Sequence, residues 1–293
     1  MYSAIAANKR NTIFIMMVFL LLIGGISWLV GYSTGDYGIA ITIAAVGAIY
    51  AVIQYFLASR LAVSMSGGRE ITKKDNPLLW NTVENLSISA GLPMPRVFII
   101  DDPAPNAFAT GRDPKHAYVA ATTGLLDIMN KRELNAVIAH EMSHVKNYDI
   151  RVSMIVFGLV AAISFISDIY LHSSLLNSKE ASDNAKNPIA LLFLILLLVL
   201  APLVAFIVQM AVSRQREYLA DASGALLTRD NEGLAMALEK LSSEGRPMQK
   251  QNSAMAHLYI NNPLKSGFVN KLFSTHPPIE DRIARLRESG NKM

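Results

Sequence analysis

Three long stretches without a charged side chain constrain the fold of this chain more than any other feature of its sequence. They lie between Arg10 and Asp36, between Asp36 and Arg60, and between Lys186 and Arg214. Each stretch can hold the roughly 20 residues that cross a bilayer as a helix. Lipid offers no partners for backbone polar groups, so helices are the economical solution there. The sequence therefore predicts a polytopic membrane protein that is mainly α-helical.

We place four membrane spans, near residues 12–32, 38–58, 152–172 and 189–212. The stretch 152–172 is apolar except for Asp168, so a buried amphipathic helix is the alternative for it. Asp168 is expected near the outer end of its span, where it can reach water. The first span is longer than the apolar part of a signal peptide and has no small-residue cleavage site behind it, which indicates an uncleaved anchor.

Most basic residues near the expected spans fall on one side of the membrane. They are Lys9, Arg10, Arg60, Arg69, Lys73, Lys74, Lys146, Arg151, Arg214 and Arg216. The opposite side receives only the loop around Asp36 and a mixed loop with Lys179, Glu180, Asp183 and Lys186. Positive flanks stay in the cytoplasm, so we expect both termini and residues 59–150 and 214–293 to be cytoplasmic. The net charge of +4 fits a protein that faces anionic lipid and gives no reason to expect a nucleic-acid partner.

The expected spans divide the chain into four parts. These are an N-terminal membrane hairpin (1–58), a cytoplasmic segment (59–150), a second membrane hairpin (151–213) and a second cytoplasmic segment (214–293). Helical patterns occur around residues 77–91, 213–227, 232–243 and 279–288, and strand-like runs at 96–100 and 116–121. Each cytoplasmic segment is small, so we expect the two to pack together into one α+β domain.

The first cytoplasmic segment contains an H-E-x-x-H motif, formed by His140, Glu141 and His144. Asn130 and Glu133 have the spacing of a capping box, and neither proline nor glycine interrupts the stretch that follows, so the motif lies on a helix. Residues four apart share a helix face, so both histidines can bind one metal ion. Glu141 can then act as general base on a water molecule. The alternative is a pair of histidines satisfied by hydrogen bonds in a core.

A zinc site of this kind needs a third protein ligand. The chain has no cysteine, which leaves histidines and carboxylates. A metzincin motif would continue as His-x-x-Gly-x-x-His from His144. Asn147 and Ile150 occupy the glycine and histidine positions of that pattern, so the metzincin class is excluded. Glu217 and Asp221 lie four apart on one face of a predicted helix, and either carboxylate could reach the metal. The second membrane hairpin returns the chain to the side of the motif, which favours a ligand here over a solvated charged surface.

Three strings, HEMSHVKNYD, SRQREYLAD and FSTHPPIEDRIARL, carry a resemblance to a known family. In this order they resemble the HtpX family of membrane-bound zinc metalloproteases, a bacterial branch of a group that includes the eukaryotic CAAX prenyl proteases. The resemblance covers nearly the whole chain. It implies a gluzincin-type endopeptidase with a zincin-like catalytic domain and one Zn²⁺ per chain, in the bacterial cytoplasmic (inner) membrane.

The resemblance also implies roles for single residues. His140, His144 and Glu217 would bind zinc, and Glu141 would be the general base. Asp221 matches the acid that holds a ligating histidine from behind. Asn147 and Asp149 are alternatives for that role.

Two further matches concern substrate and transition state. Asn106, Ala107 and Phe108 resemble the segment that precedes the edge strand beside the active site, where an extended peptide would add as a further strand. An ordinary turn and strand is the alternative. His276 matches a histidine that donates to the developing oxyanion, although a histidine before two prolines is more often a loop residue. We expect structural or solvated roles for the remaining histidines, His116, His172 and His257.

The expected activity is hydrolysis of membrane proteins and unfolded polypeptides, as part of protein quality control and stress response, with self-cleavage included. The quality-control role comes from the resemblance alone. The main alternative is a catalytically silent, metal-binding membrane scaffold, which the presence of Glu141 disfavours because a structural metal site needs no base. A transporter that uses Asp168 is disfavoured because that acid has no partner in the other expected spans.

Overall fold

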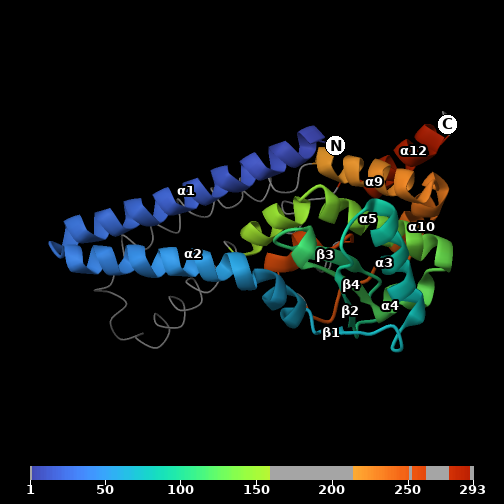
Figure 1. Cartoon of the computed structure of the whole chain (residues 1–293), viewed down its shortest axis with the longest axis horizontal. Coiled ribbons are helices and arrows are strands. Elements are labelled where there is room, and N and C mark those ends of the chain that lie inside the picture. Colours follow the sequence, from blue (N-terminus) through green and yellow to red (C-terminus); the bar gives the residue numbers. More distant parts are fainter. Residues whose placement is uncertain (1, 159–213, 251–252, 262–276, 291–293) are drawn as a thin grey trace, which may run out of the picture.

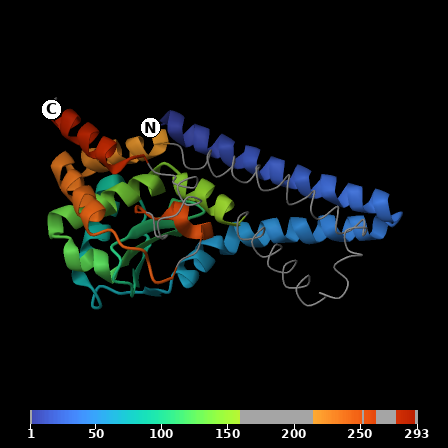
Figure 2. The same cartoon turned by 180° about the vertical axis from the view of Figure 1, so that it is seen from behind.

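The computed structural model describes residues 2–158, 214–250, 253–261 and 277–290. A long helical hairpin extends from a body in which helices surround a small sheet (Figures 1 and 2). The described part of the chain is mostly helical and contains one sheet, as expected.

The hairpin consists of α1 (Tyr2–Thr34) and α2 (Tyr37–Met65), which run side by side in both views. Large apolar side chains point outward along it; Leu21 and Ile41, for example, are 75% and 69% exposed. Such exposure is unfavourable in water and suits contact with lipid.

Length and composition allow α1 to cross a membrane within Ile5–Gly25. α2 passes the same test as two segments, Ala40–Tyr50 and Val52–Met65, bent by 43°. The first two predicted spans thus coincide with apolar helices. The span at 189–212 and most of the span at 152–172, including Asp168, lie outside the described residues and stay predictions.

The sheet has four strands in the order β1-β2-β4-β3. They are β1 (Gly68–Glu70), β2 (Arg96–Ile100), β3 (Ala107–Gly111) and β4 (Ala117–Thr122). β2 and β4 are parallel, the other two pairs are antiparallel, and β3 forms an edge. The predictions at 96–100 and 116–121 are confirmed. The residue pattern did not predict β3, because it is buried on both faces and its small residues show no alternation; only the family resemblance implied an edge strand here.

Residues 59–150 also contain three α-helices. They are α3 (Pro77–Ala90), α4 (Thr123–Ile128) and α5 (Lys131–Lys146). The capping box that starts α5 is confirmed: the Glu133 N–H donates to Asn130 Oδ1 over 3.0 Å, and the Asn130 N–H donates to Glu133 Oε2 over 2.9 Å. α5 ends in a turn at residues 147–148, and residues 149–158 are helical again.

The described part of residues 214–293 is helical, as predicted. It contains α9 (Arg214–Thr228), α10 (Asn231–Ser243), the 3₁₀ helix η2 (Ser253–Leu258) and α12 (Ile279–Gly290). α9 and α10 pack on α5, and α12 packs on α10. Ile138 of α5, Leu238 of α10 and Leu286 of α12 belong to one hydrophobic core, so the two segments fold around a shared interior.

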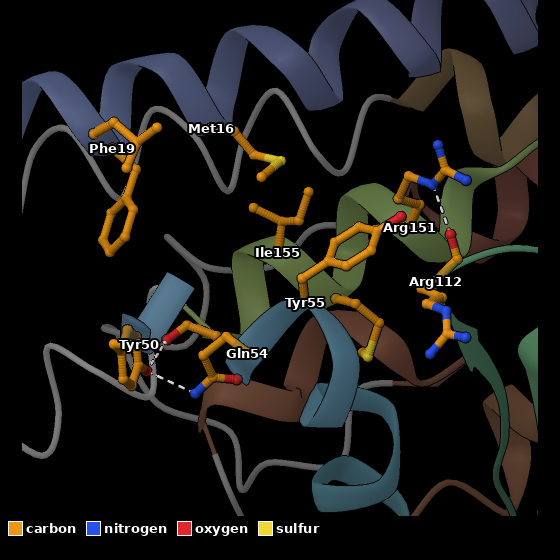
Figure 3. Close-up of a pocket in the computed structure, with 11 residues that line it drawn as sticks. Met16, Phe19, Tyr50, Gln54, Tyr55, Arg112, Arg151 and Ile155 are labelled. Carbon is orange, nitrogen blue, oxygen red and sulfur yellow. Dashed lines mark hydrogen bonds between the residues drawn. The ribbon is translucent and has the colours of Figure 1, made fainter. Parts of the chain in front are cut away.

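An apolar pocket marks the junction between the hairpin and the body (Figure 3). It is lined from α1, α2 and residues 151–158, by side chains that include Phe19, Tyr50 and Ile155. At one end of it the Arg151 Nε donates to the carbonyl of Arg112, just beyond β3, over 2.6 Å. This bond ties the helix that follows the motif to the edge of the sheet.

Candidate metal centre

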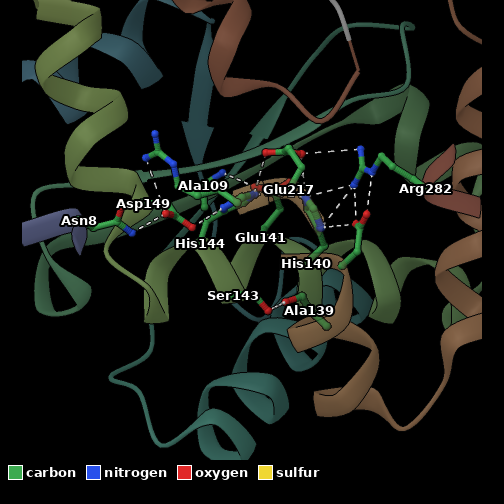
Figure 4. A network of polar contacts seen from close by, with 12 residues as sticks. Asn8, Ala109, Ala139, His140, Glu141, Ser143, His144, Asp149, Glu217 and Arg282 are labelled. Atoms are coloured by element: carbon green, nitrogen blue, oxygen red, sulfur yellow. Dashed lines mark hydrogen bonds and ion pairs between the residues drawn. The ribbon is translucent and has the colours of Figure 1, made fainter. Parts of the chain in front are cut away.

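Three side chains from two helices converge in the interior of the body (Figure 4). His140 and His144 come from α5, and their Nε2 atoms lie 3.2 Å apart. Glu217 comes from α9, with its carboxylate oxygens 3.7 Å from His140 Nε2 and 3.6 Å from His144 Nε2. The motif residues therefore share one site with a carboxylate more than seventy residues further along the chain, by way of the contact between α5 and α9.

The dimensions of this cluster suit a tetrahedral metal ion. Ligand atoms about 2.0–2.1 Å from zinc lie roughly 3.3 Å from one another in tetrahedral geometry. The three separations are close to this value, and two imidazoles with one carboxylate form the ligand set of catalytic zinc sites that keep a position open for water. The residues present therefore fit the metal that the motif implies.

His140 is held from behind by Asp221. The Asp221 Oδ1 lies 2.9 Å from His140 Nδ1, on the side of the ring away from Glu217. A proton on Nδ1 leaves Nε2 with its lone pair toward the metal position, which is how such a carboxylate fixes the tautomer of a ligand. This is the position expected for Asp221.

Arg282 of α12 holds Asp221 in turn, and no role was predicted for it. The fully buried guanidinium donates from Nε to Asp221 Oδ2 over 2.9 Å and from Nη2 to Oδ1 over 2.7 Å. Burial raises the pKa of Asp221, but the charge and hydrogen bonds of Arg282 outweigh it and lower the pKa to about 2. The sequence contains a usable signal, because Arg282 shares the stripe of Ile279, Ile283 and Leu286, where a charge is out of place.

His144 is held from behind by Asp149. The Asp149 Oδ2 lies 3.0 Å from His144 Nδ1. Burial lowers the pKa of His144, but this hydrogen bond and the nearby charges of Glu217 and Asp149 outweigh it and raise the pKa to about 9. The pair reproduces on His144 the arrangement of Asp221 on His140. Asp149 was predicted only as an alternative to Asp221, and the structure places one of these acids behind each histidine.

Glu141 lies between the metal position and the edge strand. It is buried, and its Oε2 accepts a hydrogen bond of 2.8 Å from the N–H of Ala109 in β3. An edge strand offers every second N–H and C=O away from its sheet, and those of Ala107, Ala109 and Gly111 lie on that side. The motif glutamate is therefore aligned by the strand beside the site.

The expected substrate segment is partly occupied by the chain itself. The Ile260 N–H donates to the carbonyl of Ala107 over 3.0 Å. Asn106 and Asn261 exchange two hydrogen bonds, of 2.8 and 3.1 Å, and the Phe108 ring packs edge-on against Tyr259. Residues 259–261 therefore cover the edge at 106–108, and the part of β3 next to Glu141 is Ala109–Gly111.

The remaining candidate residues are placed as follows. The side-chain amide of Asn147 has no hydrogen bond within the described part of the chain, and it does not hold a metal ligand. His116 is exposed beside Asp113. His257 donates from Nε2 to the Ser153 carbonyl over 3.0 Å and lines the pocket that contains Glu141, a place that sequence reasoning missed. His276 and His172 lie outside the described residues.

Gly224 allows α9 to approach α5 closely enough for Glu217 to reach the histidines. A Cβ atom at this position would lie 2.9 Å from the backbone nitrogen of His140. We expect Gly224→Ala to push the helices apart, lower the free energy of unfolding by about 1–3 kcal/mol and weaken metal binding. Chelator competition and thermal unfolding measure both effects. Ser223→Ala on the same helix is the control, and unchanged metal affinity in Gly224→Ala would contradict the role of this contact.

Sequence comparison places these residues in a family. The model of peptidase family M48 matches residues 73–289. The Protease HtpX homolog of Tropheryma whipplei (strain TW08/27) is 58% identical over 293 residues, covering 100% of this chain and 99% of the relative. The Protease HtpX homolog of Leuconostoc citreum is 48% identical over 301 residues, covering 98% and 99%. That of Dictyoglomus turgidum is 46% identical over 293 residues, covering 99% and 95%.

The fold is similar to that in the crystal structure of S. mikatae Ste24p. The TM-score is 0.50 at 17% identity, with 98% of this chain and 67% of that chain covered. At this identity the similarity concerns the fold alone. The family model, together with relatives that match from end to end, shows that the chain belongs to peptidase family M48.

Proposed function

We propose that this membrane metalloprotease is a zinc-dependent endopeptidase that cleaves membrane proteins and unfolded polypeptides at the cytoplasmic face of a bacterial inner membrane. Family membership supports the assignment as a metalloprotease. The assignment of a catalytic, rather than structural, metal site rests on one observation of the structure. Glu141 lies beside three side chains, His140, His144 and Glu217, whose ligand atoms are all within 4.8 Å of one another. A purely structural metal site would have no use for a buried glutamate that is aligned without being a ligand.

The residues of this site would divide the reaction between them. Zinc bound by His140, His144 and Glu217 would polarise the peptide carbonyl and lower the pKa of a bound water molecule to about 7. Glu141 would take a proton from the attacking water and pass it to the leaving nitrogen. The hydrogen bond from Ala109 keeps the carboxylate directed into the site. We assign the oxyanion donor to His276 by family resemblance.

An extended substrate would bind along β3. Main-chain hydrogen bonds to an edge strand position a scissile bond without demanding a sequence. Because residues 259–261 already cover the edge at Ala107, we place the substrate along Ala109–Gly111, next to Glu141. The substrate strand then starts later than the predicted Asn106, Ala107 and Phe108.

The position of the site relative to the hairpin supports substrates at the membrane. Asp149 and Arg151 lie between the metal position and the helical residues that begin the third expected span. A site this close to the bilayer would reach loops and displaced segments of membrane proteins. The roles in quality control and stress response, and self-cleavage, rest on the family resemblance.

The proposed function is tested with the full chain purified in detergent. We expect cleavage of an unfolded protein such as casein to stop when a chelator removes the metal, and to return when one equivalent of zinc is added back. Metal-independent cleavage, or failure of any divalent metal to restore activity, would exclude this function.

The proposed orientation is tested by cysteine labelling, which the absence of native cysteines makes clean. Ser89→Cys and Ser243→Cys lie at exposed positions of the body, and Tyr37→Cys at the tip of the hairpin. In intact cells an impermeant thiol reagent should label Tyr37→Cys and leave the other two unlabelled until the membrane is opened. Labelling of Ser89→Cys from outside would contradict this orientation and place the active site on the opposite side of the membrane.

A further inference from the structure

We propose that Asn8, near the start of the first membrane helix, positions the metal site by orienting Asp149 against His144. Asn8 precedes the charge-free stretch of α1 and lies far from the motif in the sequence. It is nevertheless 4% exposed and packs against the turn that follows α5. The inference rests on the proposed zinc site and extends it to a residue outside the matched family region 73–289.

Two hydrogen bonds connect Asn8 to this turn. Its Nδ2 donates to the backbone carbonyl of Asn147 over 2.8 Å and to Asp149 Oδ1 over 2.6 Å. The second oxygen of the same carboxylate, Oδ2, lies 3.0 Å from His144 Nδ1. One carboxylate therefore joins α1 to the metal-binding face of α5 (Figure 4). Both protons of the Asn8 amide have partners, which fixes the plane in which Asp149 is held.

The turn that Asn8 holds is conformationally demanding. Tyr148, between Asn147 and Asp149, has a φ of 63°, a left-handed conformation that bulky residues rarely adopt. Two cations lie over its ring, Lys9 Nζ at 5.0 Å and the Arg151 guanidinium at 4.9 Å from its centroid. Such a conformation persists only where the surroundings impose it. Asn8 and Lys9 of α1 supply part of those surroundings.

No other described contact replaces the bond from Asn8. Arg216 of α9 also faces Asp149, but its Nη1 is 3.9 Å from Oδ1, too far for a hydrogen bond. Asp149 is 5% exposed, so water has little access to the oxygen that Asn8 binds. Without Asn8, Asp149 could turn toward Arg216 and away from His144. The metal site is thus complete only when α1 lies against the body.

The first test measures metal binding by the full chain in detergent. Removing a partner that orients a ligand weakens affinity by about 10–100-fold. Asn8 acts through such a partner, Asp149, so we expect Asn8→Ala to weaken zinc binding measurably and by no more than this amount. Chelator competition gives the affinity, and the visible spectrum of the Co²⁺ form reports the ligand geometry. Asn11→Ala, at a half-buried position of the same helix, is the matched control and should bind zinc as the unmodified chain does.

An isosteric change separates hydrogen bonding from packing. Asn8→Asp keeps the shape but sets a carboxylate against Asp149 and against the carbonyl of Asn147. We expect it to weaken zinc binding at least as much as Asn8→Ala and to alter the Co²⁺ spectrum. In the double variant Asn8→Asp with Asp149→Asn, an amide again faces a carboxylate, so affinity should recover relative to Asn8→Asp.

The outcomes separate this inference from the proposed function. If His144→Ala loses zinc while Asn8→Asp binds it normally with an unchanged Co²⁺ spectrum, Asn8 is only a packing residue and the inference fails. Failure of the double variant to recover affinity would also overturn it. If the unmodified chain binds no zinc, the proposed function itself fails.

Discussion

Glu141→Gln is expected to abolish peptide hydrolysis while the chain still binds one zinc ion. The glutamine has nearly the same shape and can still accept the hydrogen bond from Ala109, so β3 and α5 should keep their arrangement. The ligand set is untouched. What disappears is the group that accepts a proton from the attacking water, and a positioned base of this kind contributes typically about 10²–10⁴-fold in rate. Peptidase rates and zinc content on the same preparation measure both parts.

Glu280→Gln, at an exposed position of α12, makes the same chemical change away from the site and should leave both quantities unaltered. Strong residual hydrolysis by zinc-loaded Glu141→Gln, in a preparation free of other proteases, would contradict the assignment of Glu141 as the base. A loss of zinc from this variant would point instead to a direct contact between Glu141 and the metal.

The parts of this fold that sequence reasoning could reach are those set by local contacts. Asn130 and Glu133 satisfy each other's backbone groups within one turn, so the start of α5 is readable from the spacing of two residues. The i, i+4 relation of His140 and His144 is equally local. The charge-free stretches within α1 and α2 have the length of a bilayer.

The parts that could not be reached depend on contacts between distant segments. The bond from Asn8 to Asp149 spans 141 residues, and nothing near either residue distinguishes it from a solvated pair. β3 lacks any alternation because it is covered on both faces. In the sequence, Gly224 is only a residue of low helix propensity. Its role in the close packing of α9 on α5 is visible only in the structure, where it lies against the backbone of His140. Arg282 differs, because a charge in an apolar stripe is a visible signal.

The choice between Glu217 and Asp221 also needed the structure, and it yields the second large prediction. Both carboxylates lie on one face of α9, so spacing alone left either as the third ligand. Glu217 faces the Nε2 atoms of both histidines, at 3.6 and 3.7 Å. Asp221 faces the Nδ1 of His140 instead, and Arg282 binds both of its oxygens. A carboxylate held in this way is poorly placed to turn toward the metal.

Glu217→Ala should therefore lose most of its zinc on dialysis, because two imidazoles hold the ion too weakly. Asp221→Ala should keep its zinc under excess metal and turn over slowly, since loss of such a supporting acid costs about 10–100-fold in affinity or activity. It also removes both hydrogen bonds from the buried Arg282 to Asp221 and leaves Glu217, 3.8 Å away, as the acidic neighbour of that charge, so this variant should be the less stable of the two. Mass spectrometry of metal content and thermal unfolding measure both variants. If Asp221→Ala is the empty protein and Glu217→Ala the loaded one, the third ligand is Asp221, and the approach of α9 to α5 must differ when metal is bound.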